Sequence, residues 1–91
     1  MDLNNSKVLV IGGAGFIGSH LITELLKEPI KEIVVYDNFS RGKYENIKDA
    51  LKDERCYIYP LGGDIRDTDI LDKAMEDVDY VFLLAAMWLL H

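Results

Sequence analysis

The chain has 91 residues, of which 49% are hydrophobic and 29% charged, so it is one folded domain or a part of one and not a disordered segment. A formal net charge of −6 without a basic cluster argues against nucleic-acid binding, and the single cysteine excludes an internal disulfide or a cysteine-based zinc site. Residues 1–6 are too polar for a secretory signal, and the longest apolar run, residues 81–90, is too short to span a bilayer. We therefore expect a cytoplasmic protein with no membrane contact and no metal site.

The first predicted elements are a strand, a glycine-rich turn and a helix in immediate succession. Residues 7–12 predict a strand buried on both faces, because its apolar residues are consecutive and do not alternate with polar ones. Residues 16–28 predict a helix that ends before Pro29, since the residue before proline avoids the helical region. The apolar stripe expected to face a sheet consists of Ile17, Leu21, Ile22 and Leu25.

The glycines of the turn fit two spacings of a dinucleotide-binding motif, one that starts at Gly12 and one that starts at Gly13. One of these two early glycines lets the chain leave the strand sharply, because glycine adopts positive φ without a Cβ clash. Gly15 leaves space for a phosphate oxygen near the backbone, and Gly18 lets the helix pack close to the strand.

The start of the helix provides the second half of this motif. The N–H groups of its first turn, near Phe16 and Ile17, have no partner within the helix and carry the positive end of its dipole. They therefore suit a pyrophosphate. The alternative is a turn that contains glycine only to change direction.

Residues 32–36 predict a second strand, which Asp37 closes. A carboxylate at the end of this strand can accept hydrogen bonds from both hydroxyls of an adenosine ribose, and it would repel a 2′-phosphate. Asp37 therefore favours NAD over NADP, although Arg41 could in principle hold that phosphate. The alternative for Asp37 is an acid that only stabilises a turn.

The next segments predict a polar surface helix and an edge strand. Residues 44–53 form the helix, with Ile47 and Leu51 as its buried ridge. Residues 55–61 form the strand, and Pro60 places it at an edge of the sheet because proline cannot donate to a neighbouring strand.

A third helix, capped by Asp67 or Thr68, leads to a fourth strand over residues 79–86 that is apolar on both faces. The apolar face of this helix consists of Ile70, Leu71, Ala74 and Met75. These elements predict an α/β fold: a Rossmann-type parallel sheet with strand order 3-2-1-4 and crossover helices, truncated after strand four. We expect the outer edge of strand four to pair with another chain, so that the isolated chain self-associates. The alternative is that this edge is ordered only beside further segments of a longer parent protein.

Residues 10–21, with the sequence VIGGAGFIGSHL, resemble the N-terminus of the NAD-dependent nucleotide-sugar epimerase/dehydratase family, the extended short-chain dehydrogenase/reductases. Three further segments agree with that family in order and spacing: residues 37–42, 63–67 and 82–86. The resemblance implies that residues 1–91 are the N-terminal part of an NAD-binding Rossmann domain, and that the catalytic and substrate-binding parts are absent.

The resemblance also implies which residues contact NAD beyond the glycine turn. The implied adenosine-ribose loop comprises Asp37, Asn38, Ser40, Arg41 and Gly42. The implied contacts to the edge of the adenine come from Asp64 and Ile65. The residues implied beside the nicotinamide ribose are Leu84, Ala85 and Ala86.

Family members carry out their chemistry with a Tyr-x-x-x-Lys pair and a nearby Ser or Thr. Tyr44 and Lys48 have this spacing, but they lie in the polar helix before the adenine segment, so we interpret them as a solvated pair. We expect no catalytic residue in these 91 residues, and a nucleotide-sugar substrate only for a longer parent. The alternatives are a non-catalytic dinucleotide-binding module, or a unit that binds no cofactor and serves only folding or interaction.

Overall fold

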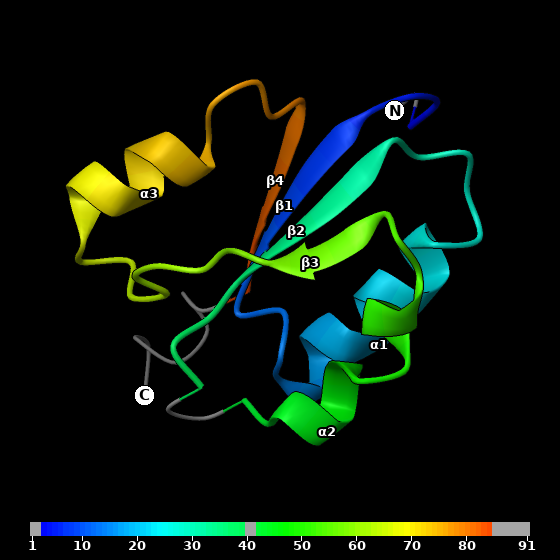
Figure 1. The fold of residues 1–91 in the computed structure, drawn as a ribbon, viewed down its shortest axis with the longest axis horizontal. Coiled ribbons are helices and arrows are strands. Elements are labelled where there is room, and N and C mark those ends of the chain that lie inside the picture. The colour runs from blue at the N-terminus through cyan, green and yellow to red at the C-terminus, as the bar shows by residue number, and fades with distance from the viewer. Residues whose placement is uncertain (1–2, 40–41, 85–91) are drawn as a thin grey trace.

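The computed structural model describes residues 3–39 and 42–84. Strands and helices follow one another along the chain (Figure 1) as β1 (Lys7–Ile11), α1 (Phe16–Leu25), β2 (Glu32–Tyr36), α2 (Tyr44–Ile47), the 3-10 turn η1 (Ala50–Lys52), β3 (Cys56–Ile58), α3 (Thr68–Ala74) and β4 (Tyr80–Leu83). All strand pairs are parallel, and the sheet order is β3-β2-β1-β4. The predicted α/β fold with a 3-2-1-4 sheet is confirmed, including the position of β3 at an edge.

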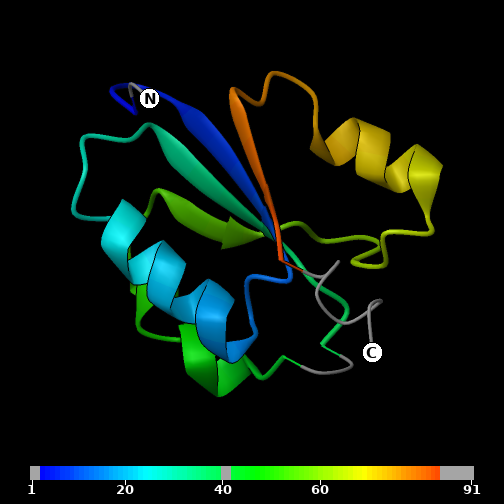
Figure 2. The ribbon, with the colours of Figure 1, turned by 180° about the vertical axis from the view of Figure 1, so that it is seen from behind.

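The sheet separates two hydrophobic clusters, because successive side chains of a strand point to opposite faces. Figures 1 and 2 show α1 and α2 together on one side, with α3 apart from them. The cluster on the α1 side contains Val8, Val10, Ala14, Ile22, Leu25, Ile30, Ile33, Val35, Ile47 and Cys56. The cluster on the α3 side is smaller and contains Leu9, Ile11, Val34, Tyr36 and Ala74.

Helix α1 differs from its prediction in length and in orientation. It ends at Leu25, and the guanidinium of Arg55 then donates to the carbonyl oxygens of Leu26 at 2.7 Å and Glu28 at 2.9 Å. Arg55 therefore supplies hydrogen-bond donors to carbonyl oxygens just after the end of α1, where the helix itself no longer provides N–H partners. The prediction that Ile17 faces the sheet is wrong, since its side chain is 54% exposed. The buried residues of α1 are Gly18, Ile22 and Leu25.

Two other segments are shorter than predicted, and the third helix begins where its cap was predicted. The polar helix of residues 44–53 is divided into α2 and η1, with Ile47 buried and Leu51 partly buried. Strand β3 covers three residues of the predicted 55–61, since Pro60 has no N–H group and Gly62 adopts φ +69°. The helix before the fourth strand starts after Asp67, and Met75 beyond its end is 40% exposed.

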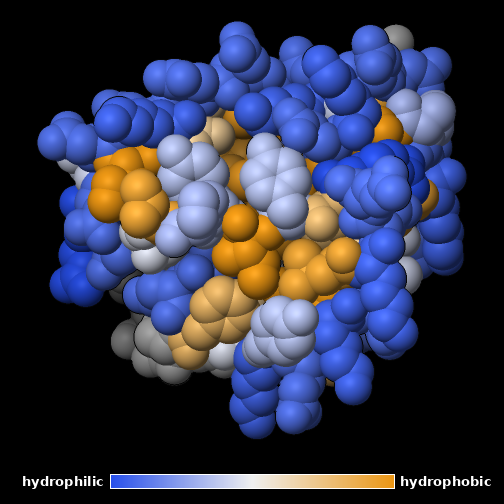
Figure 3. All heavy atoms as spheres, viewed as in Figure 1, coloured by the Kyte–Doolittle hydropathy of each residue, from blue (hydrophilic) through white to orange (hydrophobic). Residues whose placement is uncertain are grey.

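The predicted burial of strand four on both faces is wrong. Tyr80 and Phe82 are partly buried on the α1 side, whereas Val81 is 41% and Leu83 is 50% exposed on the α3 side. Within the described residues, the α3 side lacks a side-chain layer that covers this end of the sheet. Figure 3 shows one face of the molecule, on which apolar side chains gather near the centre and polar ones surround them. No helix in residues 3–39 and 42–84 is long and apolar enough to cross a membrane.

Candidate dinucleotide-binding site

The glycine turn leaves β1 at Gly12, which adopts φ +85° and donates its N–H to the carbonyl of Tyr36 at 2.9 Å. Gly12 is therefore the glycine that needs positive φ, and Gly13 is not. The turn closes with a bond from the N–H of Gly15 to the carbonyl of Gly12 at 3.2 Å. Gly15 then caps α1 in an extended conformation, so the helix begins directly at the end of the central strand.

The two later glycines of the turn meet different surroundings. A Cβ atom on Gly18 would lie 2.5 Å from the carbonyl oxygen of Gly12 and 2.7 Å from the Cα of Gly13, so α1 packs directly on the turn. Among residues 3–39 and 42–84, a Cβ atom on Gly15 would meet only the oxygen of Gly12, at 3.4 Å. The described residues therefore leave the space in front of Gly15 open, as the approach of a phosphate requires.

The first turn of α1 borders this open space. Phe16 is 73% and Ile17 54% exposed, and the first turn contains no acidic side chain that would occupy its N–H groups. These N–H groups carry the positive end of a ten-residue helix. Turn and helix together fit a pyrophosphate, which backbone donors and the helix dipole would stabilise.

Asp37 lies directly after β2 and is tied to the glycine turn. Its Oδ2 accepts the N–H of Ala14 at 2.9 Å, and its Oδ1 accepts the N–H of Phe39 at 2.7 Å. The bond to Phe39 is a turn contact, as the alternative interpretation supposed, but the bond to Ala14 reaches the glycine turn that follows the neighbouring strand β1. A carboxylate has about four acceptor positions, so about two remain for ribose hydroxyls.

The segment after β3 lies against Asp37. Gly63 adopts φ +98°, and a Cβ atom there would collide with the backbone of Asp37. The Tyr36 hydroxyl donates to the carbonyl of Asp64 at 3.1 Å, which ties the segment to the end of β2. The glycine turn, Asp37 and residues 63–65 therefore meet at the carboxyl ends of the parallel strands, where open α/β sheets bind their ligands.

The Asp64 side chain is held by Arg66, whose Nη2 lies 2.6 Å from Oδ2. Hydrogen bonds from the Arg66 side chain and backbone lower the pKa of Asp64 from 3.8 to about 2. Asp64 is therefore an anion at neutral pH, with acceptor positions left beside the guanidinium. Ile65, the second residue implied at the adenine, is half-buried next to it and packs on the α3-side cluster.

For the other candidate residues, the structure gives few contacts that relate them to the site. Gly42 lies against the turn, Asn38 is exposed, and Leu84 donates its N–H to the carbonyl of Ile11 at 2.9 Å. Four candidates lie outside the described residues: Ser40, Arg41, Ala85 and Ala86. The described part of the chain contains no cluster of three His, Cys, Asp or Glu side chains that could hold a metal ion.

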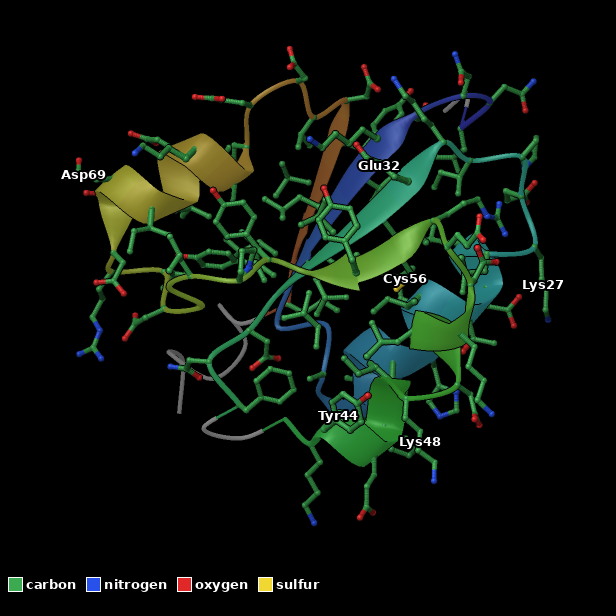
Figure 4. All side chains as sticks on the ribbon, in the orientation of Figure 1. Lys27, Glu32, Tyr44, Lys48, Cys56 and Asp69 are labelled. Atoms are coloured by element: carbon green, nitrogen blue, oxygen red, sulfur yellow. The ribbon has the colours of Figure 1, made fainter. Side chains whose placement is uncertain are left out.

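Tyr44 begins α2 and Lys48 directly follows its end, and both lie near the lower rim of the molecule (Figure 4). The side chain of Tyr44 is 57% exposed and that of Lys48 is also exposed, in agreement with the prediction of a solvated pair. Asn46, between them, was missed as a residue of the site. Its Nδ2 donates to the carbonyl of Ala14 at 2.9 Å, a contact between residues that the sequence separates widely.

Comparison with known sequences agrees with this geometry. The chain matches the 3-beta hydroxysteroid dehydrogenase/isomerase family over residues 9–91. It is 37% identical over 81 residues to UDP-glucuronic acid decarboxylase 3 of Arabidopsis thaliana, and 39% identical over 83 residues to UDP-glucose 4-epimerase of Rickettsia bellii. These matches cover 89% and 88% of this chain but 22% and 24% of the relatives, so the chain spans about a quarter of their length.

Solved structures of similar proteins also contain NAD and match most of this chain. The enzyme WbmF of Bordetella bronchiseptica in complex with NAD+ has a TM-score of 0.74 and 33% identity, over 90% of this chain and 23% of that protein. UDP-glucuronic acid 4-epimerase of Bacillus cereus in complex with NAD has a TM-score of 0.72 and 38% identity, over 86% of this chain and 26% of that protein. The resemblance to nucleotide-sugar epimerases and dehydratases is thus confirmed, and the chain belongs to the 3-beta hydroxysteroid dehydrogenase/isomerase family.

Proposed function

We propose that the chain binds NAD at the carboxyl ends of β1 and β2. The pyrophosphate lies against the start of α1 in front of Gly15, and the adenosine ribose lies on Asp37. The observation that carries this proposal is the position of Asp37, whose carboxylate accepts the N–H of Ala14 at 2.9 Å and so lies beside the turn. One side chain thereby brings the ribose contact and the phosphate contact to adjoining positions.

The same carboxylate sets the preference between cofactors. A 2′-phosphate would place two negative charges next to Asp37, whereas a 2′-hydroxyl can donate a hydrogen bond to it. The opposing cation of the loop, Arg41, lies outside the described residues. We therefore propose NAD and not NADP, in line with the two solved structures that contain NAD.

The activity of the whole protein is a wider proposal. The named relatives act on UDP-sugars, and this chain matches their N-terminal quarter. We propose that a longer parent carries out NAD-dependent epimerisation or a related reaction on a nucleotide sugar in the cytoplasm. Residues 1–91 would supply the cofactor-binding part and no catalytic residue.

Isothermal titration of the chain and its Asp37→Ala variant with NAD and NADP tests the cofactor assignment. Loss of hydrogen bonds to a charged group costs about 1.5–3 kcal/mol, which corresponds to a loss of about 10- to 150-fold in NAD affinity. Glu45→Ala is the matched control, because it removes the same charge from an exposed position. Equal affinities of the unmodified chain for NAD and NADP would contradict the role of Asp37.

A second variant, Gly15→Val, tests the position of the pyrophosphate. The backbone at Gly15 has φ −73°, and a Cβ there makes only an ordinary contact, so the fold should tolerate the change. The added side chain would fill the space proposed for the phosphates and should abolish NAD binding, while circular dichroism shows an unchanged helix content. Unchanged NAD affinity would show that the glycine turn is not the site.

We also propose that the isolated chain self-associates through the outer edge of β4. The exposed side chains of Val81 and Leu83 support this, because they form an apolar strip on β4, which is an edge strand of the sheet. Light scattering of the purified chain tests it, and a monodisperse monomer would contradict it.

A further inference from the structure

We propose that Asn46 is a positioning residue for the phosphate-binding turn, which it holds from outside through the carbonyl of Ala14. The proposal rests on the proposed NAD site and adds a residue that lies outside the glycine motif and outside the ribose loop. Its basis is the 2.9 Å hydrogen bond from the Nδ2 of Asn46 to the oxygen of Ala14.

Residues outside the turn hold Ala14 through its side chain, its N–H and its carbonyl. Its side chain is completely buried, and its N–H donates to Asp37. Its carbonyl accepts two hydrogen bonds, one from the backbone N–H of Lys43 at 3.0 Å and one from Asn46. The end of β2 and the start of α2 therefore hold the two sides of one residue.

Fixing this carbonyl also fixes the next residue. The carbonyl of Ala14 and the N–H of Gly15 belong to one planar peptide group, so they cannot rotate independently. That N–H donates to the oxygen of Gly12 at 3.2 Å. Asn46 thus acts on the peptide plane that sets the direction of Gly15, the capping residue of α1. The N–H groups of Phe16 and Ile17 come next in the chain, so their direction depends on that of Gly15.

Two neighbours of Asn46 make the contact rigid. A Cβ atom on Gly42 would lie 2.7 Å from both the carbonyl carbon and the Cβ of Ala14, so this part of the loop touches the turn directly. Ile47, the residue after Asn46, is completely buried in the α1-side cluster and anchors α2 there. The backbone of Asn46 is therefore held in place, while its side chain, on an exposed residue, is ordered by the bond to Ala14 itself.

The consequence for binding is preorganisation. A phosphate gains most from donors that already point toward it, because their ordering does not reduce the binding free energy. Without Asn46, the carbonyl of Ala14 keeps one hydrogen bond from the described part of the chain, that from Lys43, and its peptide plane can tilt. The loss should fall on the pyrophosphate, while the ribose contact at Asp37 is retained.

The test compares the unmodified chain with Asn46→Ala, Asn46→Asp and Asn46→Gln. Asn46→Ala removes the donor, and Asn46→Asp keeps the size of the side chain but presents an acceptor to the carbonyl. Asn46→Gln retains an amide donor. Lys48→Ala is the control, since it changes an exposed side chain one residue beyond α2. Dissociation constants are measured for NAD and for adenosine, which lacks the pyrophosphate.

We expect Asn46→Ala and Asn46→Asp to weaken NAD binding by about tenfold and adenosine binding by less than about twofold. Asn46→Gln should recover most of the NAD affinity, and Lys48→Ala should leave it unchanged. An equal loss for both ligands, or NAD affinity within about twofold of the unmodified chain, would overturn the proposal. If Asn46→Ala does not fold, Asn46→Asp decides the question alone.

A separate measurement distinguishes this proposal from the proposed function. The amide resonances of Gly15 and Phe16 in the ligand-free chain report the orientation of the turn by NMR. They should shift in Asn46→Ala and return toward their positions in Asn46→Gln. Failure of the unmodified chain to bind NAD would reject the proposed function only, whereas unshifted resonances would reject the role of Asn46.

Discussion

The two faces of the sheet differ in how completely their apolar side chains are buried. On the α1 side, a continuous cluster joins the central strands, α1, Ile47 of α2 and Cys56 of β3. On the α3 side, the only buried residue outside β1 and β2 is Ala74, among the residues that the structure describes. Large apolar side chains such as Leu83 and Met75 stay partly in solvent there.

This difference shows what each face contributes. The α1 side contains Ala14 in its core, so packing in the main cluster helps to hold the glycine turn. The α3 side carries the segment around Asp64, which Tyr36 and Gly63 attach to the end of β2 by specific contacts. Binding to phosphates should therefore depend on core packing, whereas contacts to the adenine should depend on a few local bonds.

The largest effect should come from Ile22→Ala on the α1 side. Ile22 is completely buried, and removal of a large aliphatic side chain from such a core costs about 2–5 kcal/mol. Urea denaturation measures the loss. Leu71→Ala is the comparison on the other face, where the partly buried side chain should cost less. Equal losses would show that the two faces are equally well packed.

Gly18→Ala should lower the free energy of unfolding by a smaller amount, about 1–3 kcal/mol, because the added methyl group would lie 2.5 Å from the carbonyl oxygen of Gly12. Thermal unfolding measures it. Gly15→Ala is the matched control three residues earlier, where the same methyl group meets an ordinary contact. A stable Gly18→Ala chain with unchanged NAD affinity would mean that helix and turn separate easily.

On the thin face, Leu83→Thr should change the unfolding free energy by less than about 0.5 kcal/mol, because the side chain is already half exposed. It should lower the apparent mass in light scattering if β4 mediates self-association. Ile11→Thr, directly beside it in the sheet but 3% exposed, should destabilise the fold instead. A Leu83→Thr chain with the association of the unmodified chain would exclude this strip as the contact.

The smallest effect concerns the ion pair of Asp64. Its pKa of about 2 lies below the usual 3.8, so its stabilising contribution is complete above about pH 4 and is lost as pH falls toward 2. Arg66→Ala should return the pKa toward 3.8 and remove this contribution, so stability at pH 7 should fall only slightly, since Arg66 is 86% exposed and its pairing is screened by solvent. A carbon-detected NMR titration measures it. An unchanged pKa would mean that Arg66 does not hold Asp64 in solution.

The sequence allowed the sheet order, the edge position of β3 and the close packing at Gly18 to be predicted, because strand runs, Pro60 and the glycine spacing are local signals. Asp37 was chosen as the ribose-binding acid for the same reason, and this role stays a prediction, which its contact with the glycine turn supports. The exposure of Ile17 was not predicted. The spacing of apolar residues placed Ile17 on the buried face of the helix, whereas in the structure Gly18 faces the turn.

Asn46 could not be found from the sequence. Its partner is the carbonyl of Ala14, 32 positions away, and a backbone carbonyl leaves no residue-type signal. Arg55 is similar, since its guanidinium ends α1 by binding carbonyls of residues 26–30. The sequence placed Asn46 in a polar surface helix and Arg55 at the start of a strand, but in both cases the long-range hydrogen bond required coordinates.

The central position of β1 has a consequence during translation. β1 is made first, yet one of its two neighbours is β4, and Val8 pairs with Tyr80. At roughly 5–20 residues per second, the ribosome needs roughly 4–14 s to deliver that partner. Until then, one side of the apolar segment Lys7–Ile11 has no strand to pair with. The nascent chain therefore has a long window in which holding chaperones can recognise it.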